Sequence, residues 1–460
     1  MKAAIEQFFR LGENGTTLRT EVLGGFTTFA AMAYIIVANP AILAAAGIPI
    51  GPSTVATILV AVFGCVLMGL YANRPIAVAP YMGENAFIAF GLTAMSIAWQ
   101  QRLGAVFVAG VIFVLITLLR VRTWLASAIS PSMKHSFAVG IGLFLAFIGL
   151  YVSGIVTTFV EGLPLPALQM VSPDLIGKQA VPVKLGNLRD TRVLLAVGGF
   201  LLMVILLCRN VRGSLLIGMA VTGIAGYFCG VGAKPTAIVA LPFAGEYDLS
   251  PIAFQLDITG VLKLSFLPIL LTLFLMSFLD TLGTLVGVGA AGNMLDAKGN
   301  LPHPERPMLV DAAACVVSAT IGSSTSGAFI ESAAGVREGA RTGLSAVVTG
   351  LLFAIALFFI PLVQPLQSLG YVYGPVLVAV GVMMFGSVRK INFDDITEAV
   401  PAFVVVVMMV FTYNIANGLT AGLIVHPLLK LATGRVREIT AGGVLLALAC
   451  ILYYAFGLPH

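Results

Sequence analysis

Charged side chains are scarce in this sequence. Of 460 residues, 25 are Lys or Arg and 20 are Asp or Glu, which is 10% of the chain, whereas 59% are hydrophobic and the mean hydropathy is +1.03. A soluble domain carries about 25% charged residues, so this composition excludes a water-soluble protein. It indicates an all-α polytopic membrane protein. At roughly 30 residues for each helix and its connection, the chain has room for about 15 spans and forms one membrane domain over 1–460.

Several other signals are missing. The five cysteines lie in apolar stretches without metal-ligand spacing, so neither a metal site, a disulfide framework nor a cofactor is expected. The net charge of +5 is not gathered into a basic run with aromatic residues, which argues against a nucleic-acid partner. No G-x-x-x-x-G-K-[ST] motif occurs to support ATP-driven transport. Because charged residues precede the first long apolar run, we expect no cleavable leader.

The apolar runs predict fourteen transmembrane segments in two halves of seven. The first half is predicted to span the membrane at 21–38, 53–71, 80–97, 103–120, 136–155, 192–208 and 213–230. The second half is predicted to span it at 265–289, 308–322, 326–338, 342–361, 372–388, 398–414 and 418–433. An additional apolar segment, 441–457, is either a fifteenth span or a helix lying along the membrane.

The distribution of positive charge predicts the orientation. With the N-terminus in the cytoplasm, most Lys and Arg residues outside the long loops fall on the inner side, as expected for a multi-pass protein of the cell inner membrane. An odd number of spans in each half places the second half upside down relative to the first. The sequence therefore predicts a 7+7 inverted repeat, the arrangement of many secondary transporters.

The third span of each half begins with polar and small residues. Span three starts at Ala79-Pro80-Tyr81-Met82-Gly83-Glu84-Asn85, and span ten starts at Ser323-Ser324-Thr325-Ser326-Gly327-Ala328-Phe329. Both are expected to be interrupted half-helices. Interrupted segments at matching positions of two repeats point to a substrate site near the middle of the membrane.

Asp280 is the only ionisable residue between Leu264 and Leu295. Placing an ionised Asp at the centre of a membrane helix costs about 2.5 to 3.5 kcal/mol, so its side chain should face a polar cavity or a partner. Small and polar residues recur around it at helical spacing, on one face: Ser277, Asp280, Thr281, Thr284 and Gly287. The alternative is a structural Asp tied to a neighbouring helix.

Two further carboxyl groups fall in the interrupted spans. Glu331 stands at the start of a short helix, where backbone N–H groups are free, and its carboxylate suits the ring N–H groups of a neutral heterocycle. A capping glutamate is the alternative. Glu84 and Asn85 are the counterparts in span three. Glu84 would otherwise pair with an arginine at the rim.

These segments resemble the AzgA-like purine permeases of the nucleobase/ascorbate transporter superfamily, which share the uracil-permease fold. The resemblance covers nearly the whole chain. It is carried by the segments 14–21, 79–87, 140–144, 280–285, 330–335, 341–344 and 394–401. It implies import of hypoxanthine, guanine or adenine with a proton, and a purine site that includes Asp280, Glu331 and Asn85.

The expected site and its coupling groups follow from both arguments. Substrate binding is assigned to Asp280, Glu331, Asn85, Glu84, Thr281, Thr284, Ser326, Ala328 and Phe329. Proton coupling is assigned to Asp280, Glu331 or Glu84. The resemblance places core spans within 21–120 and 265–361, and gate spans within 136–230 and 372–433.

The sequence departs from the family pattern at three positions. It has Ser277 where the family often has Asp, Glu84 where an apolar residue is usual, and Asn417 where Asp is frequent. Another heterocycle such as uracil, xanthine or a urate-like base therefore remains an alternative, as does a homodimer. A membrane-embedded enzyme, a passive channel and an inorganic-anion carrier are the less favoured alternatives, and we expect no enzymatic activity.

Overall fold

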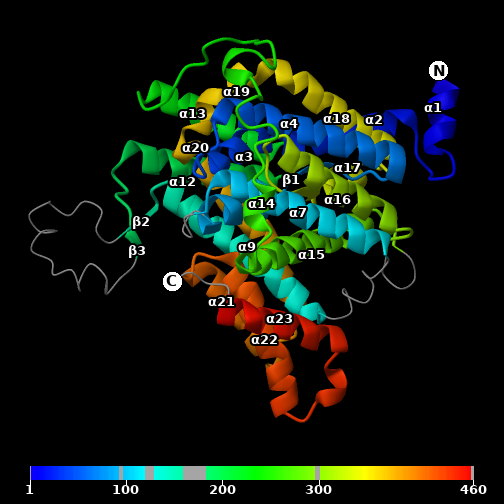
Figure 1. Ribbon diagram of the computed structural model, residues 1–460. Coiled ribbons are helices and arrows are strands. Elements are labelled where there is room, and N and C mark those ends of the chain that lie inside the picture. Colours follow the sequence, from blue (N-terminus) through cyan, green and yellow to red (C-terminus); the bar gives the residue numbers. More distant parts are fainter. Residues whose placement is uncertain (1, 93–96, 120–128, 159–182, 296–300, 457–460) are drawn as a thin grey trace, which may run out of the picture.

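The computed structural model describes residues 2–92, 97–119, 129–158, 183–295 and 301–456. It is built almost entirely of helices (Figure 1). The principal elements of the first half are α1 (Lys2–Phe9), α2 (Leu18–Met32), α3 (Ile35–Ala44), α4 (Ile50–Leu67), β1 (Val78–Pro80), α5 (Met82–Ala86), α7 (Trp99–Leu118), α9 (Pro131–Val152), β2 (Val156–Thr158), β3 (Val183–Leu185), α12 (Thr191–Cys208) and α13 (Ser214–Phe228).

The second half repeats the pattern of long helices with an interruption near its start. Its principal elements are α14 (Ile258–Val261), α15 (Leu267–Ala291), α16 (Glu305–Thr320), β4 (Ser326–Ala328), α17 (Ser332–Arg337), α18 (Gly343–Ala356), α19 (Ile360–Gln367), α20 (Gly370–Phe385), α21 (Ile396–Phe411), α22 (Ile415–Ala432) and α23 (Ala441–Phe456). Within the described ranges, nine helical segments are long and apolar enough to cross a membrane. The prediction of an all-α integral membrane protein is confirmed, whereas the count of fourteen spans stays a prediction.

The helices pack in groups that combine both halves of the sequence. One group joins α2 and α4 to α18, and α7 to α15 and α16. Another joins α9 to α20 and α21, and α12 to α13 and α20. In Figure 1, α21, α22 and α23 gather at one end of the molecule, away from α2, α4 and α18. The segment predicted at 441–457 is largely α23, which packs against α22 and α15.

A buried carboxylate fixes the contact between α2 and α18. Glu21 of α2 is fully buried and accepts hydrogen bonds from the backbone N–H groups of Arg341 at 2.7 Å, Thr342 at 3.1 Å and Ser345 at 3.2 Å. These N–H groups lie at the N-terminus of α18, where a helix leaves them without intrahelical partners and favours negative charge. A side chain from the first half of the chain therefore caps a helix of the second half.

The two interrupted segments meet as a short antiparallel sheet. Strand β1 pairs with β4 in the register Val78 with Ala328, Ala79 with Gly327 and Pro80 with Ser326. Backbone bonds extend the pairing on both sides, from Tyr81 N–H to Thr325 O at 3.0 Å and from Phe329 N–H to Ala77 O at 2.9 Å. Each strand then leads into a short helix, α5 or α17. Irregular backbone in a membrane protein is tolerated where it is buried or lines a cavity.

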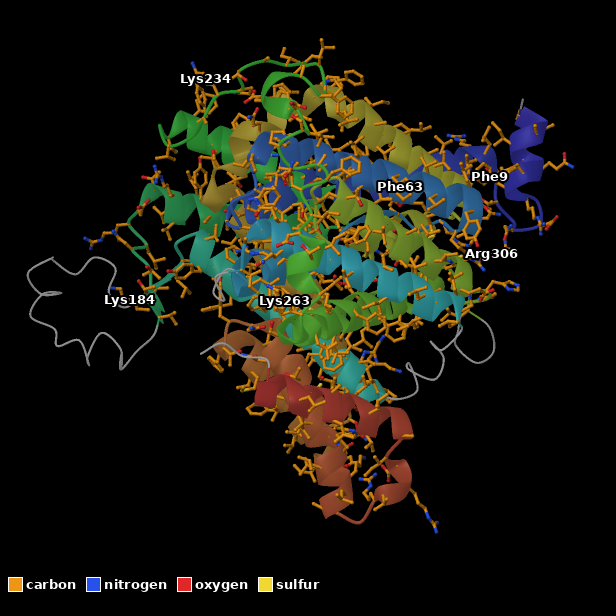
Figure 2. All side chains as sticks on the ribbon, in the orientation of Figure 1. Phe9, Phe63, Lys184, Lys234, Lys263 and Arg306 are labelled. Atoms are coloured by element: carbon orange, nitrogen blue, oxygen red, sulfur yellow. The ribbon has the colours of Figure 1, made fainter. Side chains whose placement is uncertain are left out.

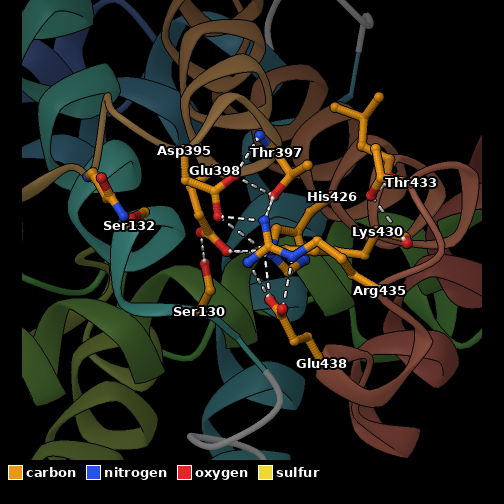
Figure 3. A network of polar contacts seen from close by, with 12 residues as sticks. Ser130, Ser132, Asp395, Thr397, Glu398, His426, Lys430, Thr433, Arg435 and Glu438 are labelled. Atoms are coloured by element: carbon orange, nitrogen blue, oxygen red, sulfur yellow. Dashed lines mark hydrogen bonds and ion pairs between the residues drawn. The ribbon is translucent and has the colours of Figure 1, made fainter.

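Many of the charged side chains outside the buried carboxyl groups lie at the edges of the helical body or in paired networks. Lys184, Lys234 and Arg306 lie at the periphery, as Figure 2 shows. A network of ion pairs joins α21, α22 and the connection to α23 (Figure 3). In it, the nearly inaccessible Lys430 ammonium contacts carboxylate oxygens of Asp395 at 3.5 Å, Glu398 at 3.0 Å and Glu438 at 2.8 Å.

Candidate functional site

Asp280 of α15 and Glu331, which precedes α17, lie close enough to interact electrostatically. Both side chains are partly exposed, although they lie in membrane segments. Glu331 occupies the N-cap position of α17 but makes no side-chain capping hydrogen bond. Its Oε1 instead accepts a hydrogen bond from the Tyr34 hydroxyl at 2.8 Å. The structure thus shows this carboxylate bound to a side chain of the first half, and not in a plain capping role.

Open space borders this pair. Gly283 lies one turn after Asp280, on the same face of α15, and a Cβ atom added there would meet no atom within 4 Å. Ile330, the residue before Glu331, is exposed as well. A Cβ atom on Gly287 would lie 2.7 Å from the Ile330 side chain, so the glycine lets that side chain pass close to α15. The small residues of α15 therefore leave room beside the two carboxyl groups.

Glu84 lies deeper than Asp280 and Glu331. It is 1% exposed, and its Oε2 accepts a hydrogen bond from the Ser277 hydroxyl at 2.7 Å. No ion pair joins Glu84 to an arginine within the part of the chain that the structure describes. Its burial places it away from the rim, beside the polar face of α15.

Asn85 is held in a chain of buried polar side chains. Its amide donates to Asn39 Oδ1 and its carbonyl oxygen accepts from the Ser324 hydroxyl. Asn39 in turn donates to Thr57 Oγ1 at 2.7 Å. Both ends of the Asn85 amide are therefore engaged between α3, α5 and the segment before β4. In this conformation Asn85 positions the interrupted span, because one of its N–H groups and its carbonyl oxygen are bound to neighbouring side chains.

The remaining predicted residues lie around the place where β1 pairs with β4, called the strand crossing below. Thr281 shares a hydrogen bond of 2.9 Å with the Tyr81 hydroxyl, and Thr284 is buried on the same helix. Ser326 and Ala328 belong to β4 and are fully buried. The Phe329 ring lies parallel to the Tyr81 ring, with centroids 6.4 Å apart and planes inclined by 9°. Two parallel aromatic rings are thus buried where β1 pairs with β4.

Sequence reasoning missed three polar residues at the crossing. Tyr34 binds Glu331, Tyr81 binds Thr281, and the carboxylate of Asp311 on α16 accepts from the Tyr81 hydroxyl at 3.4 Å. The two tyrosines gave no signal, since aromatic residues are common in apolar spans. Asp311 could have been found, because it is an acid inside the predicted span 308–322.

No metal centre is formed in the described ranges, where no group of three or more His, Cys, Asp and Glu residues is arranged to hold an ion. The polar side chains at the crossing are carboxyl, hydroxyl and amide groups. Such groups recognise hydrogen-bonding solutes and exchange protons.

Comparison with known proteins supplies the family. Residues 19–420 match the model of the Permease family. The chain is 37% identical to the adenine permease AdeP of Escherichia coli over 453 residues, covering 98% of this chain and 96% of that protein. It is also 37% identical to the guanine/hypoxanthine permease PbuG of Bacillus subtilis over 465 residues, covering 98% of this chain and all of that protein.

A solved structure shows the same fold. The transmembrane domain of the cyanobacterial bicarbonate transporter BicA aligns with a TM-score of 0.61 at 17% identity, covering 88% of this chain and 97% of that domain. The predicted absence of enzymatic activity agrees with these relatives, which are permeases and transporters. The sequence match extends over almost the whole chain and includes both interrupted segments. This protein is therefore a multi-pass membrane transporter that belongs to the Permease family.

Proposed function

We propose that this protein imports purine nucleobases such as hypoxanthine, guanine or adenine together with a proton, by alternating access. The observation that carries the proposal is the partly exposed pair of Asp280 and Glu331 beside the open space at Gly283. A purine base offers ring N–H groups, which a carboxylate accepts in charge-assisted hydrogen bonds. The names of the relatives, adenine permease and guanine/hypoxanthine permease, support the same class of substrate.

The shape of the site also favours a flat, neutral solute. Tyr81 and Phe329 present parallel rings at the strand crossing, and aromatic rings stack favourably on planar heterocycles. Two carboxyl groups without a paired Lys, Arg or His among the described residues would repel an anion. The likeness to a bicarbonate transporter therefore supports the fold and not an anion substrate.

Proton coupling is proposed because the site holds acids whose charge can change during the cycle. Asp280, Glu331 and Glu84 are the candidate groups. If one proton enters with a neutral base, one charge crosses the membrane in each cycle. A membrane potential of about 100 mV then supplies about 2.3 kcal/mol, enough for roughly fifty-fold accumulation of the base.

Alternating access needs two bodies that move relative to each other. We propose a core within 21–120 and 265–361, which carries both interrupted segments, and a gate within 136–230 and 372–433. The packing of α2 and α4 with α18, and of α9 with α20 and α21, supports this division. We also propose that the N-terminus lies in the cytoplasm of a cell whose inner membrane holds the protein. A homodimer stays an open alternative.

Uptake by cells that lack their own base permeases tests the proposal. Radiolabelled hypoxanthine should enter saturably, and unlabelled guanine or adenine should compete for entry. A protonophore should abolish accumulation, whereas replacing sodium with choline should leave it unchanged. Competition by uracil, xanthine or urate alone would replace the purine assignment with another heterocycle. Accumulation that follows sodium and ignores the protonophore would refute proton coupling.

A further inference from the structure

Asp311 is a buried carboxyl group for which the proposed function has no role. It lies on α16 and is fully inaccessible to solvent. Its Oδ2 accepts hydrogen bonds from the Ala328 backbone N–H at 3.0 Å and from the Tyr81 hydroxyl at 3.4 Å. One oxygen of Asp311 therefore joins β4 to the residue that follows β1. Its other oxygen, Oδ1, has no hydrogen-bond partner within the described structure.

Glu84 lies near Asp311 in the same buried layer. The two carboxyl groups interact electrostatically, and the Thr325 hydroxyl lies close to the Glu84 carboxyl group, although Glu84 Oε1 makes no well-formed hydrogen bond among the described residues. The buried Ser326 hydroxyl likewise has no hydrogen-bond partner there. This concentration of buried, unpartnered oxygen atoms is unusual, since the great majority of buried polar groups in proteins are hydrogen-bonded.

Among the described residues, the titratable groups that face this pair carry no positive charge. Asp280 of α15, Cys315 of α16 and Tyr81 are the titratable neighbours that interact with Glu84 or Asp311. In the described parts of the chain, no Lys, Arg or His forms an ion pair with either carboxyl group. An ionised carboxylate buried without a counter-charge costs several kcal/mol, and two adjacent ones cost more. The conformation described here is thus expected to hold at least one proton on the pair.

We propose that Glu84 and Asp311 form an internal carboxyl pair that holds the coupling proton. This internal pair is more deeply buried than the pair of Asp280 and Glu331 that binds the base. This inference rests on the proposed function, and it adds Asp311 as a coupling residue. The proton comes from water on the outer side, binds a carboxylate oxygen of the pair, and returns to water on the inner side. The net transfer is one positive charge.

The contacts of Asp311 explain how its proton would affect the substrate site. A carboxylate is a stronger hydrogen-bond acceptor than a neutral carboxyl group. Loss or gain of a proton at Asp311 therefore changes how tightly its Oδ2 holds Ala328 and Tyr81. Ala328 is followed directly by Phe329, and Glu331 lies two residues beyond that ring. Protonation of the internal carboxyl pair is in this way linked to the position of the groups that bind the base.

Measuring both exchange and accumulation distinguishes a defect in proton coupling from a defect in base binding. The protein and its Asp311→Asn and Glu84→Gln variants are reconstituted in proteoliposomes. Two quantities are measured: exchange of radiolabelled hypoxanthine across the membrane, and its accumulation driven by an imposed pH gradient. Asn and Gln keep the shape and an acceptor oxygen but cannot exchange a proton near neutral pH. Both variants should lose accumulation above the external concentration. Asp311→Asn, at a position outside the proposed base-binding residues, should retain exchange, and that exchange should no longer vary between about pH 5 and 8.

Controls make the result decisive. Asp394→Asn removes an exposed carboxyl group from the connection before α21 and should behave as the wild type. Asp311→Glu keeps an ionisable group and should restore part of the accumulation. Gradient-driven accumulation at the wild-type level in either Asp311→Asn or Glu84→Gln would overturn the inference, as would loss of exchange in Asp311→Asn while it remains folded. A wild-type protein that exchanges no purine base contradicts the proposed function itself and is recognised by that separate failure.

Discussion

The Ser277 hydroxyl donates a hydrogen bond of 2.7 Å to the carboxylate of Glu84. These are two of the three positions at which the sequence departs from the AzgA-like pattern, and they lie in different halves of the chain. An acid at 84 therefore lies in contact with the place where the family often has an acid at 277. The contact supports the interpretation that, relative to the AzgA-like pattern, a carboxyl group of this pocket has moved from position 277 to position 84.

If the carboxyl group has moved between these two positions, an acid introduced at 277 should compensate for the loss of Glu84. Glu84→Leu should reduce base uptake or shift its pH optimum, because it removes a proton-binding group from the buried layer. Glu84→Leu combined with Ser277→Asp should recover part of the loss, because the new carboxyl group lies beside the former position of the Glu84 carboxylate. Uptake measured against pH for the wild type, both single variants and the double variant checks this. A Glu84→Leu variant that equals the wild type at every pH would exclude a role for Glu84.

The carboxyl groups facing the open space should be required for binding. Asp280→Asn and Glu331→Gln each remove a charge-assisted acceptor for the base, and loss of such a bond costs roughly 1.5 to 3 kcal/mol. The apparent KM for hypoxanthine should rise more than about tenfold in each variant, while the protein still reaches the membrane. Tyr34→Phe removes the hydroxyl that orients Glu331 and should have a smaller effect of the same sign. Wild-type kinetics in Asp280→Asn and Glu331→Gln would refute the site.

Much of the fold could be predicted from the sequence because the bilayer imposes simple rules. Long apolar runs predict helices, and the polar starts of the segments at 79 and 323 predict the interruptions. Asp280 and Glu331 stood out because acids are costly inside a membrane. The pairing of β1 with β4 could not be predicted in register, since it joins segments far apart in the chain through three residues on each strand.

The direction in which each polar side chain points could not be predicted from the sequence either. Glu84 and Asn85 are adjacent, yet one contacts α15 while the other bonds to Asn39 and Ser324. Periodicity places neighbouring residues on different faces of a helix, but it does not say what each face meets. The partner of Asn85 on α3 depends on the tertiary packing of several spans. The sequence therefore indicates which residues are polar at the crossing better than it indicates what they contact.

The ion-pair network at the ends of α21 and α22 should contribute to stability. Lys430 contacts three carboxylates and is almost inaccessible, so Lys430→Met removes a side chain that bridges all three. We therefore expect the unfolding midpoint of the purified protein to fall, by a modest amount because the carboxylates are partly exposed and Arg435 still pairs with Asp395 and Glu438. Lys263→Met, at an exposed position before α15, is the matched control and should leave the midpoint unchanged. Equal midpoints for Lys430→Met and wild type would show that the network is dispensable.

The same network predicts a loss of stability in acid. Hydrogen bonds from Thr397 and Arg435 hold the pKa of the Asp395 carboxyl well below its usual range. A carboxyl group with a lowered pKa in the folded state stabilises the fold above its unfolded pKa, and that contribution disappears as the pH falls through the folded pKa. The wild-type unfolding midpoint should therefore fall more steeply below about pH 4 than that of Asp395→Asn. Parallel pH profiles for the two proteins would contradict this role of Asp395.

The space beside Asp280 provides a test that does not alter any charged or hydrogen-bonding group. Gly283→Ala should leave uptake nearly unchanged, because the added Cβ atom meets no atom within 4 Å and Ala is favoured over Gly in a helix by about 1 kcal/mol. Gly283→Leu extends a larger side chain into the space that the base is proposed to occupy, so uptake should fall more than about tenfold while the protein remains folded. Gly198→Leu on α12 is the matched control, since a Cβ atom there also meets nothing within 4 Å. This position is far from Asp280 and Glu331 in the sequence, and α12 packs mainly with α13 and α20, whereas Asp280 lies on α15. Equal hypoxanthine uptake by Gly283→Leu and Gly198→Leu would mean that the base does not pass beside Asp280.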